Sequence, residues 1–205
     1  MELCEQAAKY KDEAAKARNE DVAIKLLDKA ISLWLQSAEQ DITEVQRAAC
    51  IGNARNSEAN RCTMIASKLV DAAIASSGSK QAGYLKEAAD QMLTAVSSRT
   101  EAAEIVKEQG YQAPYYNRLG IAYTDQAFHH YYLAWASYAV GDTKSALSGY
   151  KEALSILKTA LKHINKSLQI ESNRDRRKSR KDCLDYMKLC RAGIREAKAK
   201  RRSVR

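Results

Sequence analysis

The amino-acid sequence predicts an all-α protein of seven or eight antiparallel helices, packed as a bundle or a short solenoid. Three observations support this prediction. The 205 residues include one Pro and eight Gly, a very low content of residues that interrupt helices. Apolar residues recur at intervals of three and four, whereas strand-like alternation is scarce. With 45% hydrophobic residues the chain can bury a substantial core, so extensive disorder is not expected.

Two helices are predicted at the start of the chain. Apolar residues form one stripe along residues 2–17, and a second stripe follows along residues 22–38. Asn19 or Glu20 interrupts the pattern between them. The short interruption indicates that the two helices are antiparallel neighbours.

A third helix is expected to start at residues 41–44, where Asp and Thr are suited to cap it. We expect this helix to bend or stop at Gly52 and Asn53, because glycine is a poor helix former. The helical pattern resumes around Ser57 and continues to about Ala73. The small polar residues 76–79 then predict a turn.

The second half of the chain has two clear breaks. A helix is predicted over residues 80–108, and residues 109–114 end it, with Gly110 suited to a C-terminal cap and Pro114 to the first turn of the next helix. That helix is predicted to reach about Val140. After a turn at residues 141–142, another helix is predicted over residues 143–171, and a last, basic helix follows Asn173.

The strongest local motif lies around the turn at residues 141–142. Small residues, which let two helices approach closely, alternate with large residues, which fill the gaps between the small ones. The residues of this pattern recur at helical spacing: Leu133, Ala134, Tyr138, Gly141, Asp142, Ala146, Leu147, Tyr150, Ala153 and Leu154. This pattern resembles a tetratricopeptide-type helical hairpin over about 30 residues. It departs from that family at Ser137, where a large aromatic is usual, and in the absence of a following proline. The long helices are similar also to microtubule-interacting-and-trafficking domains.

Aromatic residues are concentrated in the predicted helix from Pro114 to Val140. Seven side chains share one face of it by their spacing: Asn117, Ile121, Thr124, Phe128, Tyr131, Trp135 and Tyr138. The resemblance to tetratricopeptide proteins implies that this face lines a concave peptide-binding side, with Asn117, Phe128, Tyr131, Trp135 and Tyr138 as candidate binding residues. The alternative is that these aromatics form ordinary core, and the two interpretations can apply at different turns of the helix.

Charge divides the chain into a neutral domain at residues 1–173 and a basic segment at residues 174–205. The segment has 14 Lys and Arg against 4 Asp and Glu, whereas the rest of the chain is nearly neutral. Leu184, Met187, Cys190 and Ile194 form an apolar stripe, so the segment is predicted to be an amphipathic helix with a short tail. It either docks as a terminal helix with a solvated charged face or binds an anionic partner. The candidate anion- or nucleic-acid-binding residues are Arg176, Arg177, Lys178, Arg180, Lys181, Lys198, Lys200, Arg201 and Arg202.

Other classes of function find little support in the sequence. No apolar run is long enough for a membrane span, and the acidic start does not resemble a secretory signal. The five cysteines are scattered without a CxxC pair, which favours inert thiols in a reducing compartment. No metal-ligand spacing, phosphate-binding loop or nucleophile motif is present. We therefore expect no metal, no cofactor and no enzymatic activity.

The sequence favours a non-catalytic adaptor that binds a helix or an extended peptide of another protein on its aromatic face. The alternative is a nucleic-acid-associated helical protein that uses its basic C-terminal segment, and an acidic protein is an equally compatible partner for that segment. The expected location is the cytoplasm, or the nucleus if the source is eukaryotic.

Overall fold

The computed structural model describes residues 2–40 and 42–203, and these form seven α-helices joined by short turns. The all-α prediction is confirmed. Asp41, which was expected at a helix start, lies outside the described residues, as do Val204 and Arg205 of the basic segment. The helices are α1 (Glu2–Lys16), α2 (Glu20–Ala38), α3 (Glu44–Ile74), α4 (Gly78–Glu108), α5 (Gln112–Ala139), α6 (Thr143–Ile170) and α7 (Arg174–Ser203).

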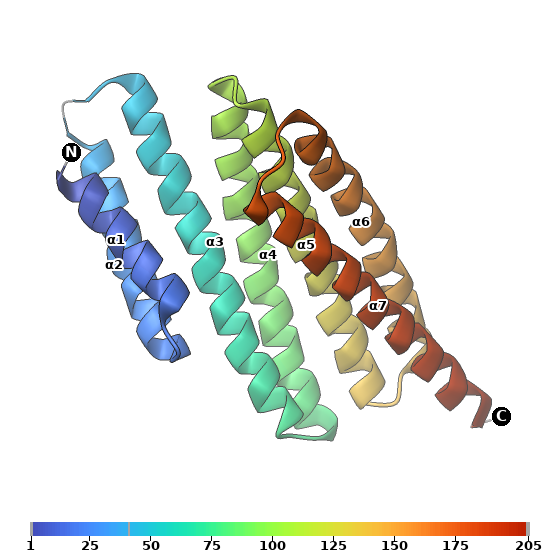
Figure 1. The fold of residues 1–205 in the computed structure, drawn as a ribbon. Helices are drawn as coiled ribbons and strands as arrows, with labels where there is room; N and C mark the ends of the chain where they lie inside the picture. Colours follow the sequence, from blue (N-terminus) through green and yellow to red (C-terminus); the bar gives the residue numbers. More distant parts are fainter. Residues whose placement is uncertain (1, 41, 204–205) are drawn as a thin grey trace.

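The helices are stacked in sequence order (Figure 1). They follow one another from α1 and α2 at one side of the molecule to α6 at the other, and each packs mainly against its neighbours in the chain. The final helix, α7, lies over α6 and also contacts α5. Consecutive antiparallel helices with short turns produce this nearest-neighbour packing, which is the arrangement predicted for a stack of hairpins.

Polar side chains cap the N-termini of several helices. The Asn19 side chain accepts hydrogen bonds from two backbone N–H groups of α2, and Thr43 and Gln46 form a reciprocal capping box at α3. Asp142 accepts from the Ser145 N–H at α6, and Asn173 accepts from the Arg176 N–H at α7. Such caps satisfy backbone donors that have no partner within the helix, so they fix where each helix begins.

Two glycines allow the sharp turns on either side of α5. Gly110 has a φ of 80° after α4, and Gly141 has a φ of 88° between α5 and α6. Residues with a side chain rarely adopt these left-handed conformations. Both breaks were predicted, and the turn at Gly141 closes the hairpin that the sequence motif indicated.

The prediction that the helix stops at Gly52 and Asn53 is wrong. Helix α3 continues through both residues to Ile74, and Gly52 is buried. A Cβ at Gly52 would lie 3.4 Å from Ile105 Cγ2 of α4 and 3.5 Å from Arg118 Nη1 of α5. Glycine costs a helix only about 1 kcal/mol, so close packing of the neighbouring helices keeps α3 intact here.

The largest hydrophobic cluster lies between α5, α6 and α7. Its buried centre combines Leu157 and Ile164 of α6 with Cys183, Met187 and Cys190 of α7. The amphipathic stripe predicted for the basic segment therefore docks onto the stack, and α7 is an integral layer of the fold. Elsewhere, small buried residues let neighbouring helices pack closely. An example is the contact of Ala59 and Cys62 of α3 with Ala95 of α4.

Candidate binding groove

A groove of about 880 Å³ lies between α3 and α7, and α4 and α5 contribute to its lining. Polar residues of α3 form one wall, with Asn56, Asn60, Thr63 and Ser67 following one another at helical spacing. The opposite wall is α7, which contributes Asp175, Lys178, Ser179, Asp182 and Tyr186. The groove therefore exists because α7 returns over α5 instead of extending the stack.

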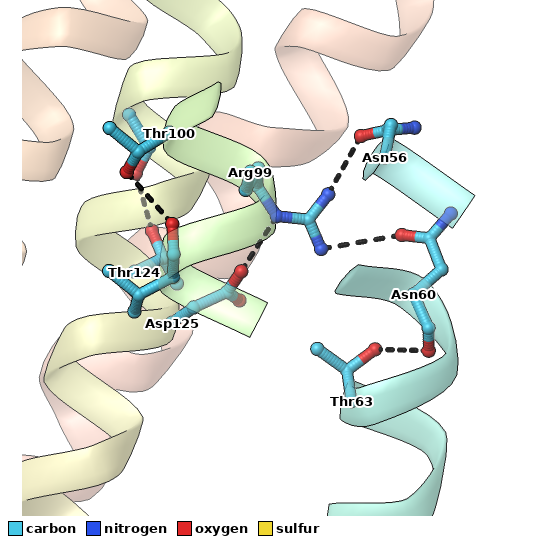
Figure 2. Close-up of polar contacts among 9 residues, drawn as sticks. Asn56, Asn60, Thr63, Arg99, Thr100, Thr124 and Asp125 are labelled. Atoms are coloured by element: carbon cyan, nitrogen blue, oxygen red, sulfur yellow. Dashed lines mark hydrogen bonds and ion pairs between the residues drawn. The ribbon is translucent and has the colours of Figure 1, made fainter. Parts of the chain in front are cut away.

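A buried ion pair stabilises the groove's lining (Figure 2). Arg99 of α4 donates from Nε to Asp125 Oδ2 of α5 at 2.7 Å, and both side chains are more than nine-tenths buried. The other two nitrogens of the same guanidinium donate to α3: Nη1 bonds Asn56 Oδ1 at 3.0 Å, and Nη2 bonds Asn60 Oδ1 at 3.3 Å. One side chain thus links three helices at the groove.

Opposing influences act on the Asp125 carboxyl group. Burial raises its pKa, because a charged carboxylate loses its hydration, and the Arg99 guanidinium counters that shift. The short charge-assisted bond to Arg99 favours the ionised form. The pair is therefore stable only as a unit, because either charge alone would be buried without compensation.

The Arg99 contacts also fix the orientation of two amides. Because Asn56 and Asn60 accept from Arg99 through Oδ1, each turns its NH₂ group away from the guanidinium, as Figure 2 shows. Their spacing of four places the two residues on one face of α3. Among the described residues, Asn117 Oδ1 on α5 is buried with no hydrogen-bond partner. The groove thus offers the amide donors of Asn56 and Asn60, whereas the Asn117 acceptor is covered by its surroundings.

One part of the groove is apolar. Phe128 and Tyr132 of α5 lie beside Met92 of α4, and Tyr186 of α7 completes this part of the lining. The Phe128 and Tyr186 rings meet edge to face, with 4.3 Å between their centroids. Polar amides next to an aromatic pocket suit a peptide, which carries both a polar backbone and apolar side chains.

The structure separates the predicted aromatic face into two parts. Asn117 and Phe128 line the groove together with Ile121 and Thr124. Tyr131, Trp135 and Tyr138 do not line it. They pack against the cluster formed by Ala134, Ala146, Tyr150 and Ala197, which joins α5, α6 and α7. Burial raises the pKa of Tyr131 to about 12, as expected for a ring enclosed by neighbouring helices.

The predicted basic residues also differ in their surroundings. Arg176 is buried and donates to the Glu171 carboxylate and carbonyl oxygen, both at 2.9 Å, so it holds the α6–α7 turn. Lys178 lines the groove, and Lys200 lies 4.5 Å from the centroid of the Tyr138 ring. The remaining candidates are exposed: Arg177, Arg180, Lys181, Lys198, Arg201 and Arg202.

A basic surface extends beyond α7 onto α6. Five exposed lysines of α6 recur at intervals of seven and four on the side away from its buried residues: Lys144, Lys151, Lys158, Lys162 and Lys166. Arg180 of α7 donates to Asn165 of α6 at 3.1 Å, which places the basic side of α7 next to this stripe. We call the combined surface the basic face: the α6 lysines with Arg177, Arg180, Lys181, Lys188, Arg191, Arg195 and Lys198.

The central residues of the groove were not predicted from the sequence, although one signal for them was present. Arg99 follows Ala88, Met92 and Ala95 on the apolar stripe of its helix, at spacings of four, three and four. A charged residue on a buried stripe requires a compensating partner. Nothing in the sequence, however, identifies that partner as Asp125, because the two lie on different helices.

The histidines take part in helix packing and do not form a metal cluster. His129 Nδ1 is 2.9 Å from the Ala89 carbonyl oxygen, His130 Nδ1 is 3.5 Å from Glu152, and His163 stacks on Tyr123. Within residues 2–40 and 42–203, no group of three or more His, Cys, Asp or Glu side chains is arranged to hold a metal ion. Over the same residues, no helix has the length and apolar character needed to cross a membrane.

Comparison with known proteins identifies no relative. No family model matches the chain, and neither the curated proteins nor the solved structures include a significant match.

Proposed function

We propose that this protein is a non-catalytic adaptor that binds an extended peptide segment of another protein in the groove between α3 and α7. The observation that carries the proposal is the pair of asparagines held by Arg99 beside an aromatic pocket. The hairpin-like packing of α5 and α6 supports the resemblance to tetratricopeptide proteins, whose concave sides bind peptides.

The asparagines suit a peptide backbone for a physical reason. A peptide bond has one N–H donor and one C=O acceptor, and the NH₂ groups of Asn56 and Asn60 can donate to alternate carbonyl oxygens, which face the same side of an extended chain. Their hydrogen bonds to Arg99 already restrict both side chains, so binding costs little further side-chain entropy. An apolar side chain of the peptide would then enter the pocket formed by Phe128, Tyr132 and Tyr186.

A groove-filling substitution tests this proposal. Peptides selected from a displayed library of unstructured 16-residue sequences would be measured by fluorescence anisotropy. We expect Ser67→Arg, which places a long side chain in the groove, to weaken their binding about tenfold or more. Ser97→Arg makes the same change at an exposed position of α4 outside the groove lining, and it should leave binding unchanged. Equal affinities for the two variants would argue against the groove.

A second candidate function is binding of double-stranded nucleic acid on the basic face. The observation that favours it is the adjacency of the α6 lysine stripe to the basic side of α7. The acidic residues Asp175 and Asp182 lie instead on the side of α7 that lines the groove. This segregation leaves a surface on which several Lys and Arg side chains could contact phosphates together.

Charge reversal on α6 distinguishes this function from a merely solvated surface. We expect the double variant Lys158→Glu with Lys162→Glu to bind a fluorescein-labelled 20-base-pair DNA duplex about tenfold more weakly. The logarithm of its association constant should also depend less steeply on the logarithm of the salt concentration. Lys80→Glu with Lys86→Glu changes the net charge equally on exposed positions of α4 and should have a much smaller effect. Equal losses from both pairs would show only a dependence on net charge.

A further inference from the structure

Two cysteines that are far apart in the sequence lie in contact. Cys4 Sγ of α1 is 3.3 Å from Cys50 Sγ of α3, and it is 2.8 Å from the hydroxyl oxygen of Ser37 on α2. Ser37 also lies 3.6 Å from Cys50 Sγ, so the three side chains form one cluster where α1, α2 and α3 meet. No disulfide joins the two sulfurs, and both thiols are free.

The two thiols differ in access to solvent. Cys50 is buried, whereas Cys4 is only partly buried and can meet a small reagent from outside. The other three cysteines are buried in the interiors of α3 and α7. Of these, Cys183 lies against the Leu157 carbonyl oxygen, at 3.4 Å. An accessible thiol in contact with a buried one is the arrangement of an attacking and a resolving cysteine.

We propose that Cys4 and Cys50 are a redox-responsive pair that closes to a disulfide on exposure to a low-molecular-weight disulfide such as oxidised glutathione. This modification goes beyond the proposed binding functions and does not depend on them. The Sγ atoms need to approach from 3.3 Å to about 2 Å, a small shift for side chains at the edge of the stack.

The reaction balances as two exchange steps. The Cys4 thiolate attacks one sulfur of oxidised glutathione, which breaks the glutathione disulfide and releases one glutathione thiolate. Cys50 then loses its proton to solvent and attacks Cys4 Sγ, which forms the Cys4–Cys50 bond and releases the second glutathione. The two protein thiols are oxidised together, and one oxidised glutathione is reduced to two glutathione molecules.

The bond would fasten the first helix to the rest of the stack. Among the described helices, α1 packs mainly against α2. A bond to Cys50 would tie α1 directly to α3 and close a chain segment of more than forty residues. Such a cross-link removes conformational freedom from the unfolded chain and suppresses separation of α1 from the stack.

Burial raises the pKa of Cys50, while its hydrogen bond with Ser37 opposes that shift. The step that forms the Cys4–Cys50 bond needs the Cys50 thiolate. The rate of disulfide formation should therefore increase with pH, and the disulfide should form more slowly than the mixed disulfide of Cys4 with glutathione.

Mass spectrometry of the whole protein tests the pair directly. The protein would be equilibrated with a fixed mixture of oxidised and reduced glutathione, unfolded, and treated with iodoacetamide. We expect three of the five thiols to be alkylated, and a peptide map to join Cys4 to Cys50. Alkylation of all five thiols, a cross-link between other cysteines, or glutathione retained on Cys4 would overturn the proposal.

Matched variants complete the test. Cys4→Ser should abolish the cross-link, whereas Cys190→Ala, which removes a buried thiol far from the pair, should not affect it. Oxidation should raise the apparent Tm of the native sequence by about 5 °C, with no such rise for Cys4→Ser. The comparison of Tm values does not depend on Cys50→Ser, which changes a buried residue and can fail to fold. Cys4→Ser alters only a partly exposed side chain, so this variant keeps the proposal falsifiable.

Discussion

Replacing Arg99 with methionine is expected to lower the free energy of unfolding by about 3–5 kcal/mol. The substitution keeps much of the aliphatic volume but removes the guanidinium that compensates Asp125, whose side chain is only 7% exposed. An unpaired carboxylate at this site must either remain charged without hydration or take up a proton. Urea denaturation followed by circular dichroism measures the loss.

Two controls separate the effect of burial from that of losing any ion pair. Arg61→Met breaks the bond to Asp28 at 2.9 Å, but these side chains are 35% and 49% exposed, and the expected loss is under about 1 kcal/mol. Arg99→Met combined with Asp125→Leu removes both buried charges and should recover most of the stability. If the double variant were as unstable as the single one, the ion pair would not be the cause.

The same substitution connects stability with the proposed function. Without Arg99, the Asn56 and Asn60 side chains lose the partner that fixes their orientation. Peptide binding should therefore remain weak in the stable double variant. Recovery of stability without recovery of binding would distinguish the arrangement of the amides from the integrity of the fold.

Gly120→Ala is expected to destabilise the protein by about 1–3 kcal/mol, because α5 and α6 are in direct contact at this point. A Cβ at Gly120 would lie 2.5 Å from Ile164 Cγ1, 3.1 Å from the Ala160 carbonyl oxygen and 3.2 Å from the Ile164 nitrogen. Two of these three atoms belong to the backbone, so the helices must separate. Thermal unfolding should show a lower Tm.

Gly83→Ala provides the matched control. Gly83 is also within a helix, but a Cβ there would have no atom within 4 Å. Alanine is the better helix former, so this variant should be more stable by about 0.5–1 kcal/mol. If Gly120→Ala destabilises the protein while Gly83→Ala stabilises it, the Gly120 effect is due to packing. Stabilisation by both substitutions would instead assign both effects to helix propensity.

Local features of the sequence predicted most helix boundaries. The breaks at Asn19, Gly110 and Gly141 were recognised because each involves a cap or a left-handed backbone that nearby residues specify. The expected break at Gly52 failed because the preference of one residue was overcome by contacts with Ile105 and Arg118, both distant in the sequence.

The groove could be predicted only in part. Asn117 and Phe128 were placed on a candidate binding face by their helical spacing, and both line the groove. The same spacing could not show that α7 would pack beside Tyr131 and Tyr138. Periodicity identifies a face of a helix, but the helix that covers it is chosen by packing.

The sequence by itself determined that the chain is helical, approximately where its helices begin and end, and that its last helix is both basic and amphipathic. Those properties depend on residues within a few turns of one another. Only the tertiary structure decided that Arg99 pairs with Asp125, that the α6 lysines adjoin the basic side of α7, and that Cys4 meets Cys50. These contacts join residues on different helices, so they arise from the packing of the stack, and the periodicity within one helix does not identify the partner on another.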